Sequence, residues 1–166
     1  MKRKFVIQEK IKGSNPGKAH IGIIHLSPKN IPEGYAQESL RLSYSDTTAL
    51  ILAAACAAEI SMAYAEKSVV ISTKNPWAFA YLIGEKPCPC HLGQYYLDKI
   101  HTYEKRIFYV LEDSHVHRAA YALAHGDSQH CYDIMSRIYP DVDCHGISVG
   151  FMFTPAQKFE RGTWKI

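Results

Sequence analysis

The first 44 residues alternate apolar segments with turn signals, in the manner of a hairpin followed by a third strand. Residues 5–7 and 21–26 are rich in β-branched side chains, and the Gly-Ser-Asn-Pro-Gly turn at residues 13–17 separates them. Residues 39–44 alternate polar and apolar side chains with a period of two, which is typical of a half-buried strand. The pattern predicts three antiparallel strands.

A long helix and a crossover to parallel strands follow. Ser45, Asp46 and Thr47 offer N-cap side chains before an alanine-rich segment, which predicts a helix over residues 46–66. Its small side chains allow close packing on a sheet. The apolar segment 68–73 predicts a buried strand reached by a right-handed crossover. The remaining pattern predicts helices at 77–83, 94–104, 117–125 and 128–139, and strands at 106–111 and 147–153.

Composition narrows the class of protein. The chain has 166 residues, of which 47% are hydrophobic and 21% charged, as expected for one globular domain. A net charge of +3 does not identify a polyanionic partner by itself. The longest apolar run is too short to span a bilayer, and no apolar stretch follows the basic N-terminus. We therefore expect a cytoplasmic protein without a membrane partner, whose five cysteines are reduced.

This order of elements, together with the motifs of the first hairpin, resembles the ribonuclease H family. The hairpin carries an Asn-Pro-Gly loop at residues 15–17, followed by the strand Ile-Gly-Ile-Ile at 21–24. The resemblance covers about residues 5–125 and implies an α/β fold. Its mixed five-stranded sheet has three antiparallel and then two parallel strands flanked by helices. We predict a ribonuclease H-like domain over residues 1–126, with residues 127–166 as a helix-strand extension packed on it.

The family's chemistry uses four acidic positions that hold two divalent cations at the scissile phosphate. By resemblance, the first-strand acid falls on Glu9, with Gln8 as the alternative, and the central-helix acid falls near Leu50. The fourth-strand acid falls on Lys74, whose ammonium would repel a cation. The last-helix acid falls near Ala120 or Tyr121. The resemblance to the ribonuclease H family therefore predicts that the set of catalytic acids is degenerate in this chain.

Two other carboxylates offer replacements. Asp46 lies one turn before Leu50 on nearly the same helix face, although it also fits an N-cap role. Asp113 follows the fifth strand together with Glu112, His115 and His117, where a rebuilt site with Glu9 or a solvated strand end are the two interpretations. The candidate catalytic residues are Glu9, Asp46 and Asp113, with Mg²⁺ or Mn²⁺ as cofactor if the protein is active.

Basic residues gather around the first hairpin. Lys10, Lys12 and Lys18 flank the Asn15 loop, and Lys74 is expected at the same end of the sheet, where they could meet a phosphate backbone. Tyr35, Tyr44 and Trp77 are candidates for base stacking. The alternative is that the lysines are ordinary solvated side chains and the aromatic residues belong to the core. The candidate nucleic-acid-binding residues are Lys12, Asn15, Gly17, Lys18, Lys74 and Asn75.

Cys88-Pro89-Cys90-His91 offers a zinc candidate, which Cys131, Cys144 and His145 could complete. Zinc sites usually separate paired cysteines by two to four residues, so an exposed loop with unrelated thiols is the alternative. No phosphate-binding or dinucleotide-binding glycine motif is present, and no other cofactor is expected.

Three functions remain at this stage. The first is a ribonuclease H-like pseudoenzyme that has lost metal-dependent cleavage and binds nucleic acid, such as an RNA–DNA hybrid, or a protein partner. The second is a divergent metal-dependent ribonuclease acting on such hybrids, and the third is a zinc-stabilised interaction module. The strand at 147–153 could pair with another chain, so both a monomer and a homodimer are compatible with the sequence.

Overall fold

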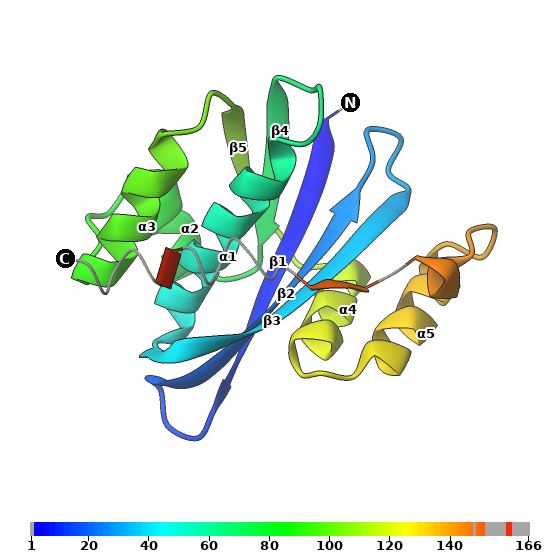
Figure 1. Ribbon diagram of the computed structural model, residues 1–166, viewed down its shortest axis with the longest axis horizontal. Coiled ribbons are helices and arrows are strands. Elements are labelled where there is room, and N and C mark those ends of the chain that lie inside the picture. Colours follow the sequence, from blue (N-terminus) through cyan, green and yellow to red (C-terminus); the bar gives the residue numbers. More distant parts are fainter. Residues whose placement is uncertain (1, 148, 152–158, 161–166) are drawn as a thin grey trace.

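A six-stranded sheet lies between two layers of helices in the computed structural model, which describes residues 2–147, 149–151 and 159–160 (Figure 1). The strands lie in the order β5-β4-β1-β2-β3-β6. Their bounds are Arg3–Lys12 (β1), Gly17–Leu26 (β2), Pro32–Tyr44 (β3), Ser68–Thr73 (β4), Arg106–Leu111 (β5) and Val149–Phe151 (β6).

Five of these strands form the predicted mixed arrangement. β1 pairs antiparallel with β2, and β2 with β3, whereas β4 pairs parallel with both β1 and β5. β1 is therefore bonded along both edges. The antiparallel connections of β1–β2 and β2–β3 and the helical connections that lead to β4 and to β5 agree with the order inferred from the sequence.

The helices divide between the two faces of the sheet (Figure 1). One core contains side chains of α1, α2 and α3, and a second core contains those of α4 and α5. The helix bounds are Asp46–Ser61 (α1), Pro76–Leu82 (α2), His91–His101 (α3), His115–Ala124 (α4) and Ser128–Ile138 (α5). None of the helices in the part of the chain that the structure describes is long and apolar enough to cross a bilayer.

β1 alternates between these two cores with a period of two. Phe5 and Ile7 are fully buried in the core of α1, whereas Val6 belongs to the core of α4. On the α1 side, every residue from Thr48 to Ala58 is buried, because the alanine side chains let the sheet and α3 approach the helix closely.

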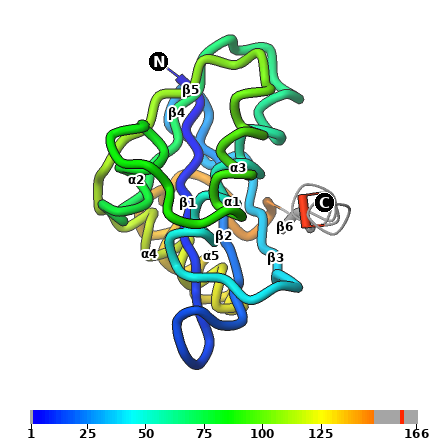
Figure 2. The backbone as a smooth tube through the Cα atoms, turned by 90° about the vertical axis from the view of Figure 1, so that its left-hand side faces the viewer, coloured from blue at the N-terminus to red at the C-terminus, as the bar shows by residue number. Residues whose placement is uncertain are grey.

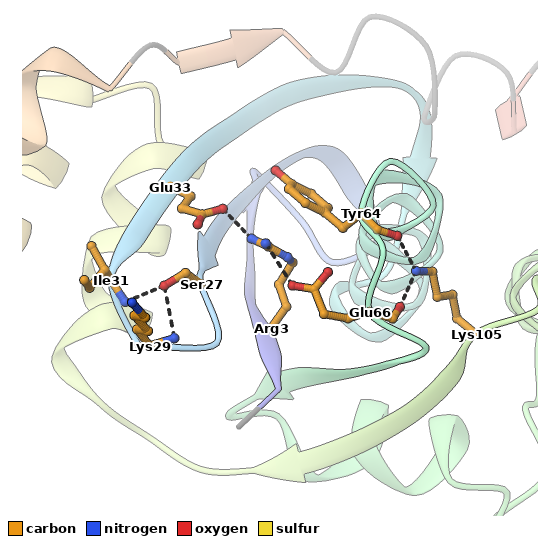
Figure 3. A network of polar contacts seen from close by, with 8 residues as sticks. All are labelled: Arg3, Ser27, Lys29, Ile31, Glu33, Tyr64, Glu66 and Lys105. Carbon is orange, nitrogen blue, oxygen red and sulfur yellow. Dashed lines mark hydrogen bonds and ion pairs between the residues drawn. The ribbon is translucent and has the colours of Figure 1, made fainter.

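α1 ends at Ser61, five residues before the predicted end at 66. The chain turns there because the following carbonyl groups have partners outside the helix. The Lys105 ammonium donates to the backbone oxygens of Tyr64, at 2.8 Å, and of Glu66 (Figure 3). Arg3, which is buried at the start of β1, pairs with Glu33 and Glu66 and stacks 3.6 Å from the Tyr64 ring (Figure 3).

The C-terminal elements pack on the same chain. α5 packs against α4 through buried Cys131 and Met135. β6 pairs parallel with residues 35–37 of β3 and so extends this chain's own sheet, while the choice between monomer and homodimer stays a prediction. Residues 148, 152 and 153 of that predicted strand lie outside the described residues. Further along β3, the Glu160 carboxylate accepts hydrogen bonds from the backbone N–H groups of Arg41 and Leu42, at 2.8–3.0 Å.

α4 lies close to β2 at Gly22. A Cβ atom at this position would lie 2.4 Å from the Ala120 oxygen and 2.8 Å from the Ala124 nitrogen, both of them backbone atoms. We expect Gly22→Ala to lower the free energy of unfolding by about 2–3 kcal/mol, because the helix must move away from the sheet. Urea denaturation measures this loss, and an unchanged midpoint would contradict the close approach.

Candidate nucleic-acid interface

The predicted site residues gather at the end of the sheet where β1 and β4 finish. The β1–β2 hairpin projects beyond the sheet at this end, next to the start of α1 (Figure 2). Asn15 at the hairpin tip accepts a hydrogen bond from the Asp46 backbone N–H at 3.2 Å, which joins the loop to the helix. Gly17 is required for this turn, because a Cβ there would lie 2.2 Å from the Ser14 backbone oxygen.

The N-terminus of α1 is capped by Ser45. Its hydroxyl accepts from the Thr48 N–H at 3.2 Å, while the Asp46 carboxylate accepts from the Thr47 N–H at 2.9 Å. Asp46 is thus a first-turn residue, where a negative charge interacts favourably with the helix dipole.

Glu9 is the half-buried acid at this end of β1. Burial, followed by the negative charge of Asp46, raises its pKa to about 7, while the ammonium groups of Lys10 and Lys74 act in the opposite direction. The structure therefore brings Glu9, Asp46 and Lys74 within electrostatic range of one another. The proton that this environment favours on Glu9 competes with any divalent cation.

These acids do not make a complete divalent-cation site. Among residues 2–147, 149–151 and 159–160, no three His, Cys, Asp or Glu side chains lie close enough together to hold a metal ion. Leu50, at the position of the family's helix acid, is fully buried in the core, and Lys74 follows β4 as an exposed cation. Asp113 is exposed beyond β5, and its charge acts on His117. The donor set does not fit a two-metal centre.

Three residues after β5, Glu112, Ser114 and His117, form a polar network with Lys4 of β1 and Ser72 of β4. Glu112 pairs with the Lys4 ammonium and accepts a hydrogen bond from the Ser72 hydroxyl at 2.8 Å. That hydroxyl contacts Nε2 of fully buried His117 at 2.9 Å, and Ser114 contacts Nδ1 at 2.7 Å. Since Ser72 donates to Glu112, it accepts from Nε2–H, so Ser114 donates to Nδ1 of a neutral imidazole.

The network also determines the charge states of its members. Burial lowers the pKa of His117, which agrees with the neutral imidazole. Burial alone would raise the pKa of Glu112, but the hydrogen bonds from Lys4 and Ser72 lower it overall. The network joins α4 to β4, and its role here is to position α4 on the sheet.

Strand alternation sends the neighbouring basic side chains to the other face. Lys10, Lys12, Lys18 and His20 share the α4 side of the hairpin, and we call these four residues the basic strip. Burial, followed by the charges of Lys12 and Lys18, lowers the pKa of His20. The Lys10 ammonium lies 5.8 Å from the Tyr121 ring centre on α4.

At the end of β4, Lys74 and Asn75 have different roles. The Asn75 amide oxygen caps α2 by accepting from the N–H groups of Trp77 and Ala78, at 2.9 and 3.1 Å. Lys74 is exposed and lines a cavity beside α4. Lys74 is therefore free to contact a phosphate, while the Asn75 oxygen is already bonded.

The aromatic candidates separate into core and surface. Tyr35 and Tyr44 are buried, which confirms the core interpretation for both. Trp77 is 55% exposed on α2, where the Lys86 ammonium lies 4.3 Å from its ring centre.

The zinc candidates sit at the start of α3. The Cys88 thiol donates to the Cys90 backbone oxygen at 3.6 Å, and Cys90 is the N-cap residue of the helix. His91 is exposed, while Cys131 and Cys144 are buried in the second core. In the described part of the chain, no three of these potential ligands lie close enough together to hold a metal ion, so zinc binding stays a prediction.

Sequence reasoning missed a second set of polar residues, on α4 and α5. Arg118 and Tyr121 on α4 are three residues apart, and His125, the C-cap residue of α4, follows four residues later. On α5, His130 and Arg137 are seven residues apart, which is two helical turns. The sequence alone therefore shows that these exposed side chains, Arg and His with one Tyr, share a face on each helix.

Comparison with known proteins places the fold. No model of a known protein family matches the sequence, and no curated protein is a significant relative. Among solved structures, RNase H1 from the halophilic archaeon Halobacterium salinarum is 14% identical, with a TM-score of 0.65, and the match covers 78% of this chain and 99% of that one. LC11-RNase H1, solved in complex with an RNA/DNA hybrid, is 15% identical, with a TM-score of 0.67 and coverage of 78% and 98%.

This chain has a ribonuclease H-like fold. The N-terminal RNase H domain of Rv2228c from Mycobacterium tuberculosis agrees, with 12% identity, a TM-score of 0.64 and coverage of 74% and 97%. The ribonuclease H-like fold confirms the resemblance inferred from the element order and the Asn-Pro-Gly loop. At these identities the likeness concerns the fold, and the activity of this chain has to be argued from its own residues.

The raised pKa of Glu9 predicts a pH-dependent stability. Between about pH 4.5 and 7, folded Glu9 keeps a proton that the unfolded chain has released, so the free energy of unfolding falls as the pH rises. We expect Glu9→Gln to be more stable than the wild type at pH 8 by about 1 kcal/mol, after allowance for partial solvent access. Urea midpoints should show this difference shrinking as the pH falls towards about 4.5; a constant difference would argue against the protonated carboxyl.

Proposed function

We propose that this ribonuclease H-like protein binds an RNA–DNA hybrid through the basic strip and Lys74, without metal-dependent cleavage. The observation that carries the proposal is the exposed Lys74 ammonium near Glu9 and Asp46, at an end of the sheet where no three potential metal ligands gather among the described residues. Lys74 lies where the family resemblance calls for an acid, and it acts electrostatically on Glu9. An ammonium at this place neutralises phosphate charge without supplying a Lewis acid.

The choice of ligand is supported by charge and by the fold. The lysines of the basic strip form no ion pair with any carboxylate in the described part of the chain, so their charges are available to phosphates. LC11-RNase H1, a solved neighbour with the same fold, has been captured with an RNA/DNA hybrid.

Binding is measured with a labelled blunt hybrid at several salt concentrations. We expect Lys12→Gln/Lys18→Gln to weaken binding about tenfold near 0.1 M salt and to reduce the salt slope by about two. The matched control is Lys29→Gln/Lys67→Gln, which removes two exposed lysines at the opposite end of the sheet, one after β2 and one before β4. Equal losses in both double variants would mean that binding has no defined site, and a hybrid that does not bind at all would favour a protein-binding scaffold.

Cleavage is tested on the same hybrid with Mg²⁺ or Mn²⁺, alongside Glu9→Gln. The proposal predicts that the hybrid stays intact in both samples. The second candidate, a divergent ribonuclease, is favoured by the proximity of Glu9 and Asp46. Metal-dependent cleavage that Glu9→Gln abolishes would establish that candidate and overturn the loss of activity.

A further inference from the structure

Two adjoining cavities lie along α4 and α5, and Lys74 at the end of β4 also lines the first of them. Their volumes are about 290 and 450 Å³, and both are lined by Arg118, His130 and Ile134. The two cavities adjoin at this shared wall, and we call them together the α4–α5 groove. Each part has room for a group of about the size of a nucleotide.

The groove carries unbalanced positive charge. Lys74 lines the first part, Arg137 lines the second, and Arg118 lines both. Asp127 is the acidic residue of the lining, and it caps α5 by accepting from the His130 N–H at 3.0 Å. None of the three cations forms an ion pair with a carboxylate in the residues that the structure describes. An anionic ligand would supply the missing negative charge.

An aromatic surface lies among these cations. Tyr121 is 41% exposed, and its ring is nearly parallel to that of His125, with an interplanar angle of 12° and 6.3 Å between ring centres. Both residues line the first cavity, and buried Ile134 forms an apolar part of its wall. Aromatic faces beside a positive groove are typical of sites for unpaired nucleic acid, whose bases are free to stack.

The groove is continuous with the hairpin end of the sheet. Lys74 belongs to the proposed hybrid-binding end and also lines the first cavity. The ammonium of Lys10, in the basic strip, lies against Tyr121, so a chain of positive charge runs from the hairpin onto α4. The second wall of the groove comes from α5, which lies beyond the residues that resemble the ribonuclease H family.

We propose that the α4–α5 groove binds an unpaired strand that continues from the duplex on the basic strip, with phosphates on Arg118 and Arg137 and a base on Tyr121. This assignment rests on the proposed hybrid binding for the duplex part of the ligand. The two are separable, because the groove acts only on the unpaired segment.

The test compares a blunt hybrid with the same hybrid carrying an eight-nucleotide overhang, as either DNA or RNA, by fluorescence anisotropy. We expect the overhang to tighten binding to the wild type about tenfold. Arg118→Gln/Arg137→Gln should abolish this gain while leaving the affinity for the blunt hybrid within about twofold. Tyr121→Ser should reduce the gain without changing the salt slope, because it removes stacking and no charge.

Lys29→Gln/Lys67→Gln is again the control, since it removes the same net charge at the opposite end of the sheet. An overhang that gives no gain with the wild type, or a gain that the arginine variant keeps, would overturn the assignment. If the blunt hybrid fails to bind while a free single strand binds and depends on Arg118 and Arg137, the groove stands and the proposed hybrid function fails. Circular dichroism of every variant confirms that loss of binding is not loss of folding.

Discussion

The pleat of β1 is the constraint on which the rest of the structure depends. β1 is hydrogen-bonded along both edges and covered by helices on both faces. Its register therefore fixes on which face of the sheet each of its side chains lies. Consecutive side chains at its end therefore lie on opposite faces of the sheet. Glu9 lies with α1 and Asp46, and Lys10 lies with α4 and Tyr121. Acidic and basic chemistry are thus separated by the thickness of the sheet.

The electrostatics of the two faces follow from this separation. On the α1 side, two carboxylates and partial burial favour a protonated Glu9, with Lys74 near enough to oppose the effect. On the α4 side, lysines flank a neutralised histidine, His20, and lead towards the arginines of α4 and α5. A metal centre needs several carboxylates on one face, and this arrangement offers cations on the neighbouring one.

Much of the fold could be predicted from the sequence because its signals are local. The Asn-Pro-Gly turn, the N-cap candidates at residues 45–47 and the alanine-rich run each act over a few residues, and they place the hairpin and the start of α1 correctly. The cap itself is Ser45, whereas Asp46, expected in an N-cap role, is the first helical residue. The end of α1 was placed too late because Lys105 and Arg3, distant in sequence, bind the carbonyl and carboxylate groups beyond Ser61. β3 begins at Pro32 rather than residue 39 because pairing with β2 extends it past its alternating segment.

The site was harder to predict, because its properties depend on contacts between residues that are distant in the sequence. Glu9, Asp46, Asn15 and Lys74 could be expected at one end of the sheet from topology alone. The burial that raises the pKa of Glu9 and the hydrogen bond from Ser72 to Glu112 depend on neighbours from other elements. The α4–α5 groove needs two helices to pack, although the spacing of its basic side chains is visible on each helix.

The pairing of β6 with β3 has a consequence for behaviour in concentrated solution. An outer strand with unsatisfied N–H groups is a template on which further strands polymerise. Here residues 35–37 are already paired with β6, and the Glu160 carboxylate occupies the N–H groups of Arg41 and Leu42. A strand arriving from another molecule would have to displace both a strand and a buried anion. β6 and Glu160 thus cover the outer edge of β3, and the strand left at this edge, β6, is only three residues long, which makes it a short template for further strands.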